Sequence, residues 1–188
     1  MRVMTLGNMK VSDFLVLSKC LDGETVAALQ RAPKPGQVAG VDVPDDLAKM
    51  KVGLFIDLAE MKTDTDILFV PCKELLRMSD KEIMDAPVYE VYGFSRWVVS
   101  EVERIGKLFG QCRIEPTAEE RQAGAGRTDN GWFGLIDWFA RRMGITDHDY
   151  VLKQVGIMRV WNCMKIDAET RLYERRLNEV YKQKAKRR

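Results

Sequence analysis

The stretch from residue 132 to residue 161 constrains the fold more than any other part of this chain. Its first half places apolar side chains at the i, i+3, i+4 and i+7 positions of one helix face. These residues are Trp132, Leu135, Ile136 and Phe139, with Met143 one turn further. Gly144 follows, at the place where a residue in the left-handed conformation commonly ends a helix. The pattern therefore predicts a helix over residues 132–143.

A second helix is predicted to follow after a short turn. Thr146 is placed to cap it, and the acidic Asp147 and Asp149 in its first turn complement the helix dipole. Its apolar face continues through Val151, Leu152, Val155, Val160 and Trp161. Gly156 is expected to break this segment into two pieces.

The same periodicity and capping signals predict further short helices along the chain. They span residues 13–21 behind a Ser12 cap, 24–31, 44–60 with a weak point at Gly53, 64–78, 80–86 behind a Ser79 capping box, 94–108, and 168–184 behind an Asp167 cap. Residues 31–40, with two prolines and two glycines, are expected to form a loop with little to bury. Residues 1–10 favour either a short strand or an extended arm.

These elements predict a mainly α protein of about seven to nine short capped helices in a compact multi-helix domain. We expect an N-terminal helical region over 1–114, a polar flexible connection over 115–131, and a C-terminal helical region over 132–188 with a basic tail. One single domain is the alternative. Residues 79–92 also echo residues 146–161, each with a capped short helix, a Pro or Gly break, and an aliphatic–aromatic pair. Either chance or a duplicated helical hairpin explains that echo.

Composition and charge narrow the class of protein. The apolar fraction of 46% and charged fraction of 31% are typical of soluble globular domains. No apolar run reaches the roughly 18 residues of a membrane span, and the N-terminus lacks a signal-peptide pattern. Residues 1–94 carry 11 basic and 15 acidic residues, whereas residues 95–188 carry 19 and 13. We therefore expect a cytoplasmic protein with no membrane partner and a basic C-terminal half.

Residue groupings that support catalysis are absent from the sequence. The four cysteines lie at least 40 residues apart and favour reduced, mostly buried thiols. His148 is the only histidine, and its neighbours Asp147 and Asp149 would point in different directions on a helix. Helix-start charges explain this triplet better than a metal or acid–base site. We therefore expect no enzyme, no cofactor and no metal.

Binding surfaces are more plausible than an active site. Trp132 and Phe133 are adjacent, so a helix cannot turn both toward one core, and aromatic residues of this kind serve well as interface anchors. The glycine-bearing residues 124–131 lack a phosphate-loop pattern, but Arg127 within them could contact a partner. The basic C-terminus could do the same through Lys182, Lys184, Lys186, Arg187 and Arg188. Those five residues would also suit phosphate contacts to nucleic acid, or simply a solvated helix end.

The order of these parts resembles small helical virion-assembly proteins of tailed bacteriophages. The resemblance rests on residues 6–17, on the short acid-capped helices, and on residues 134–146 ahead of a charged C-terminal helix. It is most similar to tail-assembly chaperones, which are non-enzymatic and bind the tape-measure protein during tail building. It includes no diagnostic motif, so no family site residues are carried over to this chain.

The expected function is therefore chaperone-like protein–protein interaction in tail assembly, in the cytoplasm of the infected bacterial host. The expected partners are phage structural or tape-measure-like proteins, and the chain itself in a homo-oligomer. A structural virion subunit, such as a ring or head–tail connector protein, is one alternative and would be located in the virion. A nucleic-acid-associated protein using the basic C-terminus is the other.

Overall fold

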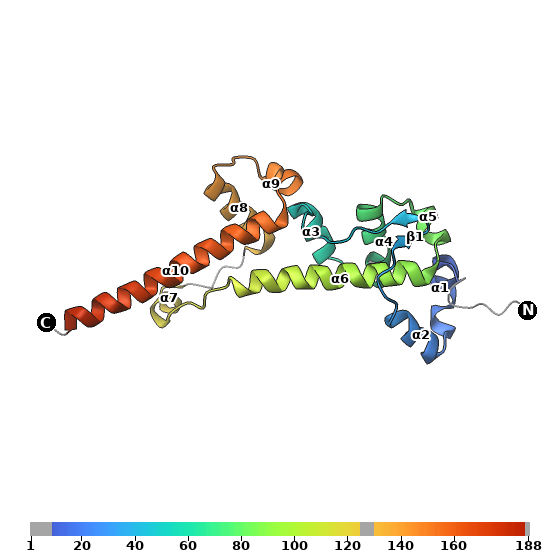
Figure 1. The fold of residues 1–188 in the computed structure, drawn as a ribbon, viewed down its shortest axis with the longest axis horizontal. Helices are drawn as coiled ribbons and strands as arrows, with labels where there is room; N and C mark the ends of the chain where they lie inside the picture. Colours follow the sequence, from blue (N-terminus) through green and yellow to red (C-terminus); the bar gives the residue numbers. More distant parts are fainter. Residues whose placement is uncertain (1–8, 125–129, 187–188) are drawn as a thin grey trace, which may run out of the picture. The chain divides into compact units, whose positions relative to one another are not determined.

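The computed structural model describes residues 9–124 and 130–186, and this part of the chain is mainly helical, as expected (Figure 1). Its only sheet is an antiparallel pair of short strands. The elements are α1 (Val11–Leu17), the 3₁₀ helix η2 (Ser18–Cys20), α2 (Gly23–Gln30), β1 (Gln37–Val38), β2 (Val41–Asp42), α3 (Val52–Ala59), α4 (Asp64–Leu76), α5 (Asp80–Asp85), α6 (Val88–Gln111), α7 (Ala118–Gln122), α8 (Gly131–Met143), α9 (His148–Gln154) and α10 (Ile157–Lys186). The described ranges thus hold ten α-helices, slightly more than the seven to nine expected.

The chain divides into two compact units. The first unit comprises residues 1–47 and 54–104, and the second comprises residues 48–53 and 105–188. The boundary expected near residue 114 falls instead inside α6, because this helix runs without a break from one unit into the other. A boundary inside a continuous helix has no linker-like stretch of sequence to mark it. The polar connection at 115–131 contains α7, and its residues 125–129 lie outside the described residues.

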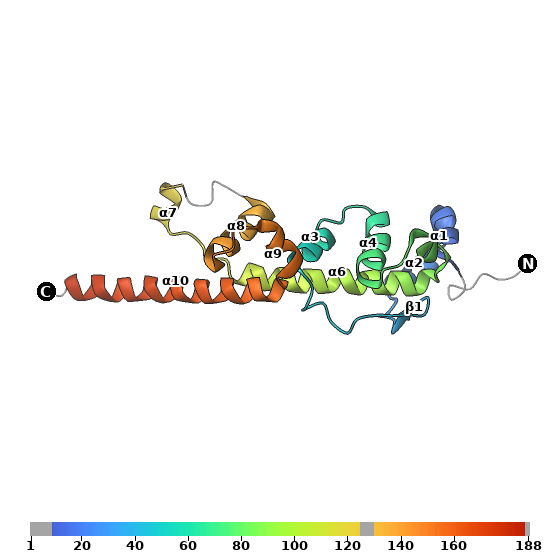
Figure 2. The ribbon, with the colours of Figure 1, turned by 90° about the horizontal axis from the view of Figure 1, so that it is seen from above.

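The first unit is built on the N-terminal part of α6, with α4 and α5 beside it (Figures 1 and 2). Capping boxes fix where α4 and α5 begin, because Thr63 and Ser79 exchange hydrogen bonds with Asp66 and Glu82 respectively. The core consists of fully buried apolar residues from several elements. They include Val11, Val38, Cys72, Ile83, Val91, Phe94 and Val98.

The segment expected to be an unburied loop, residues 31–40, contributes to this core. Val38 is fully buried, and strands β1 and β2 pair around it. The Glu90 carboxylate accepts a hydrogen bond from the Ala39 N–H at 2.8 Å, and the Lys34 ammonium lies 3.9 Å from the Trp97 ring centroid. Prolines and glycines shape this hairpin, but a buried valine and contacts from α6 hold it in place.

The second unit packs α8 and α9 against the beginning of α10 (Figures 1 and 2). Gly144 ends α8 in the left-handed conformation at φ 67°, as the sequence predicts. Asp147, rather than Thr146, caps α9 by accepting the Asp149 N–H at 2.9 Å. The end of α6 belongs to this unit too, because the Trp161 indole N–H donates to the Leu108 backbone oxygen at 3.0 Å.

The last helix differs most from its prediction. Asp167 does not cap a new helix, because α10 runs unbroken from Ile157 to Lys186. The Asp167 carboxylate instead accepts hydrogen bonds from the Arg142 guanidinium of α8 at 3.0 and 3.1 Å. An acidic residue that looks like a cap in sequence is therefore a mid-helix ion-pair partner.

The two units share one backbone arrangement. In the first unit, Lys10 pairs with Pro87 in an antiparallel bridge just before two helices, α1 and α6, begin. Two hydrogen bonds close the bridge: the Val11 N–H donates to the Ala86 oxygen at 3.0 Å, and the Val88 N–H donates to the Met9 oxygen at 2.8 Å.

The second unit repeats this bridge. Lys51 pairs with Gly156, just before α3 and α10 begin. The Val52 N–H donates to the Val155 oxygen at 3.0 Å, and the Ile157 N–H donates to the Met50 oxygen at 2.9 Å. Each unit also contains a helix that ends in a left-handed residue, followed by a short capped helix, a bend and a long helix: α4–α5–α6 in one, α8–α9–α10 in the other. The faint echo in the sequence is thus a structural repeat.

This bridge explains two corrections near the repeated segments. The helix expected over 44–60 is helical only from Val52 onward, because Met50 and Lys51 are held extended against residues 155–157. Likewise, Ser12 is not a cap, because α1 begins at Val11 directly after the bridge. The sequence signal is the triplet Met-Lys-Val, which occurs at residues 9–11 and again at 50–52.

Candidate partner-binding surface

An exposed aromatic residue lies where α8 meets α9. Phe133 is 62% exposed, although it lies in the first turn of a well-formed helix. Its ring meets the His148 imidazole edge-on, with 5.2 Å between centroids. Trp132 beside it is half-buried, which agrees with the expectation that two adjacent aromatics cannot share one core. Phe133 is therefore a partly ordered apolar side chain that the fold of its unit leaves exposed.

Charged neighbours hold His148 in place. Its Nε2 lies 3.5 Å from Asp137 Oδ1, and Asp137 also pairs with Arg141 at 2.9 Å. Tyr150, two residues along α9, is 51% exposed. The α8–α9 corner thus presents aromatic side chains next to a small network of opposite charges, which is a common composition for a protein-binding surface.

The neighbouring acids of His148 have structural roles. Asp147 caps α9, and Asp149 accepts a hydrogen bond from Lys153 at 2.7 Å, which lowers the pKa of the Asp149 carboxyl. Within the described residues, no group of three His, Cys, Asp or Glu side chains is arranged to hold a metal ion. Asp147, His148 and Asp149 therefore serve the start of the helix.

The basic residues nominated from the sequence are only partly described. Lys182, Lys184 and Lys186 are exposed on the last turns of α10. Arg127, Arg187 and Arg188 lie outside the described residues. Phe133 thus lies on α8, whereas the three lysines lie near the end of α10.

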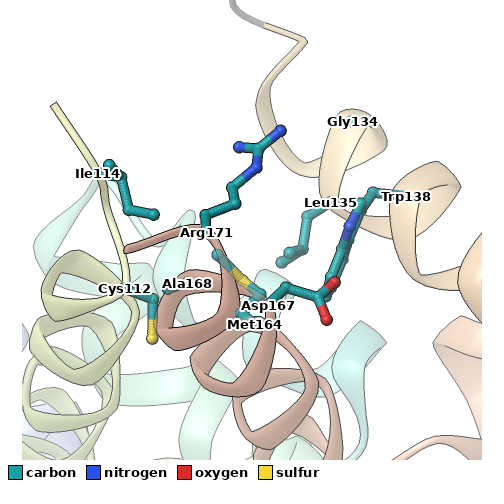
Figure 3. A pocket seen from close by; sticks show the side chains of 9 residues that line it. All are labelled: Cys112, Ile114, Gly134, Leu135, Trp138, Met164, Asp167, Ala168 and Arg171. Atoms are coloured by element: carbon teal, nitrogen blue, oxygen red, sulfur yellow. The ribbon is translucent and has the colours of Figure 1, made fainter. Parts of the chain in front are cut away.

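The sequence reasoning missed a cavity of about 480 Å³ in the second unit. Figure 3 shows Leu135 and Trp138 of α8 on one side and Cys112 and Ile114 on the other. Met164 and Asp167 of α10 lie below, and the Arg171 side chain extends upward between the two sides. The small residues Gly134 and Ala168 also line it. The sequence offers little indication of this cavity, because its lining residues fit the pattern of an ordinary apolar helix face.

Around Arg171 and Arg175 of α10 the surface becomes polar. Arg175 donates to the Glu115 backbone oxygen at 3.0 Å and to Glu120 Oε2 at 2.6 Å, which ties α10 to the start of α7. The pKa of Glu120 is lowered, first by the backbone N–H of Thr117 and then by Arg175. A second hollow of about 450 Å³ lies here, and Arg171 lines both hollows.

The cysteines are free thiols. Cys72 and Cys112 are buried, Cys163 is half-buried and Cys20 is exposed. Burial raises the pKa of Cys72 to about 12, so this thiol stays protonated at neutral pH. Cys112 is held within hydrogen-bonding reach of the Leu108 carbonyl, with its sulfur 3.6 Å from that oxygen.

Comparison with known protein families, with curated proteins and with solved structures found no match to this chain. None of the described helices combines the length and the apolar character that crossing a bilayer requires.

Proposed function

We propose that this protein is a non-enzymatic assembly factor of a tailed bacteriophage, with a chaperone-like role in tail building. The observation that carries the proposal is Phe133, 62% exposed at the corner of α8 and α9 and held by His148. A large apolar side chain on a regular helix that remains exposed is a typical interface anchor. The phage context comes from the resemblance of the sequence to virion-assembly proteins.

The chemistry of the described residues supports binding over catalysis. The one histidine lies at a helix start between charged neighbours, and the most buried thiol has a high pKa. We infer that the α8–α9 corner takes an apolar helical segment of a long tail protein. Such a segment would bury Phe133 and Tyr150, and the charges of Asp137 and Arg141 would lie at the rim, where they contribute more to specificity than to affinity.

The test is coexpression of the full chain with the long helical tail protein of the phage that encodes it. We expect a soluble complex, and we expect that Phe133→Asp weakens it at least about tenfold, because central aromatic anchors carry much of the binding energy. Val41→Asp, at an apolar residue that is 37% exposed on the β-hairpin, is the matched control and should bind like the unmodified chain. Equal binding by the Phe133→Asp variant would remove the α8–α9 corner from the proposal.

The composition of finished particles separates the alternatives. A chaperone is absent from purified particles, whereas a structural ring or connector subunit is present at a fixed copy number. Mass spectrometry of purified particles decides between them. The nucleic-acid alternative draws on Lys182, Lys184 and Lys186, and it predicts binding that falls steeply with salt.

A further inference from the structure

The C-terminal half of α10, residues 172–186, carries an apolar row on an exposed face. Tyr173, Leu177 and Val180 recur at helical spacing, and Tyr173 and Val180 are 59% and 45% exposed. Tyr181 is 57% exposed as well. The final turns of α10 extend beyond α7 in both views (Figures 1 and 2). Arg175 in this segment contacts Glu115 and Glu120, whereas the aromatic residues Tyr173 and Tyr181 stay more than half exposed.

The structural repeat indicates what such a helix end does. The long helices α6 and α10 begin at equivalent residues, Val88 and Ile157, directly after equivalent bridges. Counted from those starts, Leu177 corresponds to Leu108 and Tyr181 corresponds to Cys112. In the second unit the end of α6 is a packed component, because Leu108 accepts the Trp161 indole N–H and Cys112 lines the cavity beside α8. We therefore expect a repeat unit of this kind to pack against the end of a preceding long helix.

The first unit has a cavity at the equivalent place. It measures about 610 Å³, and residues of α4 and α6 line it together with residues of α1, η2 and α2. Three of its residues, Leu68, Ser95 and Val99, correspond to Leu135, Met164 and Ala168 around the cavity of the second unit. Cys112 and Ile114, just after the end of α6, line the cavity of the second unit, whereas Phe14, Leu15, Ser18 and Gln30 complete the lining in the first unit. No residue from the end of a long helix is among the lining residues described for the first unit.

Two further observations at this cavity point to an occupant. Ser95 is among the residues that line it, and the Ser95 hydroxyl is buried, with the residue only 1% exposed, and has no hydrogen-bond partner among the described residues. Beside the cavity, α1 exposes a short apolar run in which Val16 is 80% exposed. A buried unpaired hydroxyl and an exposed apolar rim are both costly unless another chain covers them.

We propose that residues 172–186 of one copy of this chain dock into the cavity of the first unit of a second copy. Charge favours this pairing over others, because the first unit carries 11 basic and 17 acidic residues, a net charge of −6, and the second carries 19 and 11, a net charge of +8. Opposite charges on the two docking units speed encounter and set the orientation. The charged residues that line the cavity are Asp64, Glu103 and Arg96, so the lining has a net negative charge toward the basic end of α10.

This contact joins two different surfaces, so it is heterologous. A heterologous contact continues from copy to copy and builds a ring when the rotation closes, or a filament when it does not. The inference does not depend on the phage role proposed above, because it concerns only how copies of this chain meet.

The experiment measures the mass of the full chain by light scattering and sedimentation over a range of concentrations. We expect oligomers that grow with concentration and weaken as salt rises. The helix variant Tyr173→Asp/Val180→Asp and the cavity variant Ser100→Arg/Glu103→Arg alter exposed residues, so both should keep the helical circular dichroism of the unmodified chain. Each variant alone should associate at least about tenfold more weakly. Val41→Asp and Glu60→Arg are controls of matched chemistry and should associate normally.

Mixing the two variants tests the head-to-tail geometry. The helix variant keeps an intact cavity and the cavity variant keeps an intact helix end, so an equimolar mixture should form a dimer that cannot grow further. If two α10 helices instead paired with each other, the cavity variant would associate like the unmodified chain and the mixture would form no new species. That result, or a monomer at every concentration of the unmodified chain, would overturn the proposal.

Discussion

Lys10 and Lys51 occupy the same position in the two units, and each ammonium contacts the last residue of the short helix in its unit. The Lys10 ammonium lies 2.8 Å from Asp85 Oδ1, and the Lys51 ammonium lies 2.8 Å from the Gln154 backbone oxygen. Asp85 and Gln154 each stand two residues before the bridge residue of their unit, Pro87 or Gly156. A lysine on each bridge thus reaches back to the end of the short helix. The match in a charged, exposed residue indicates that the repeat extends beyond the apolar core.

Acidic pH should destabilise the protein through its helix caps. Glu82 accepts the Ser79 N–H at 2.7 Å, and this bond lowers its pKa from the ordinary value of 4.5. A carboxyl whose folded-state pKa is lowered contributes stability that is fully present above 4.5 and is lost as pH falls through the folded-state pKa. Asp66 and Asp22 have pKa values lowered in the same way by Thr63 and Thr25. Denaturation followed at a series of pH values should show unfolding free energy falling in this acidic window.

Glu82→Gln isolates the charge in that effect, because glutamine keeps the acceptor oxygen. The variant should be less stable than the unmodified chain at neutral pH, and the difference should shrink as pH falls below 4.5. Glu179→Gln is the control, since Glu179 is exposed on α10 and makes no hydrogen bond or ion pair with a described residue. A constant difference across the whole pH range would contradict the role assigned to the Glu82 charge.

The Arg142–Asp167 pair should contribute a measurable coupling energy between α8 and α10. The Arg142 guanidinium donates to both Asp167 carboxylate oxygens at 3.0–3.1 Å. The two side chains are only about a third exposed, at 30% and 39%. Bidentate pairs exceed ordinary surface pairs, so we expect about 0.5–1 kcal/mol of coupling. A double-mutant cycle with Arg142→Gln and Asp167→Asn, measured by chemical denaturation, gives this value.

That cycle also separates two roles for Asp167. A helix cap would cost about 1 kcal/mol when removed, whether or not Arg142 is present. An ion-pair partner loses most of its effect once Arg142 is gone. Strictly additive single substitutions would therefore favour the cap that the sequence alone suggests.

Asp167 shows why part of the fold could not be predicted from the sequence. Local signals predicted the helices at 64–76, 80–85 and 131–143 well, because signals such as the Ser79 capping box and the helix end at Gly144 act within a few residues. The same signals failed wherever a distant partner decided the outcome. Met50 and Lys51 read as helix but are held extended by residues 155–157, and Asp167 reads as a cap but pairs with Arg142. The sequence predicted that Trp132 and Phe133 would not both face one core, and the structure shows that Phe133 is the exposed one. The cavities could not be predicted, because they depend on which helices meet.

The indole N–H of Trp161 should stabilise the second unit. It donates to the Leu108 oxygen at 3.0 Å in a half-buried place, so Trp161→Phe leaves that oxygen with the Cys112 thiol, a weak donor whose sulfur lies 3.6 Å away, in place of the indole. We expect a loss of about 1–2 kcal/mol in unfolding free energy, measured by denaturant titration. Trp138→Phe on α8 is the matched control, because the Trp138 indole makes no hydrogen bond with a described residue and its removal should cost less. Equal losses would show that ring volume, rather than the hydrogen bond, matters at residue 161.

Two glycines on α6 should respond in opposite directions to alanine. A Cβ at Gly93 would collide with the Pro33 backbone oxygen, so α6 can approach the segment before the β-hairpin only with glycine there. We expect Gly93→Ala to cost about 2 kcal/mol, because neither the buried helix nor a backbone carbonyl moves easily. A Cβ at Gly106 meets no atom within 4 Å, so Gly106→Ala should stabilise the protein by about 0.5–1 kcal/mol through helix propensity. Chemical denaturation of the two variants measures both changes. Stabilisation by Gly93→Ala would mean that residues 31–40 do not pack against α6 as closely as the structure places them.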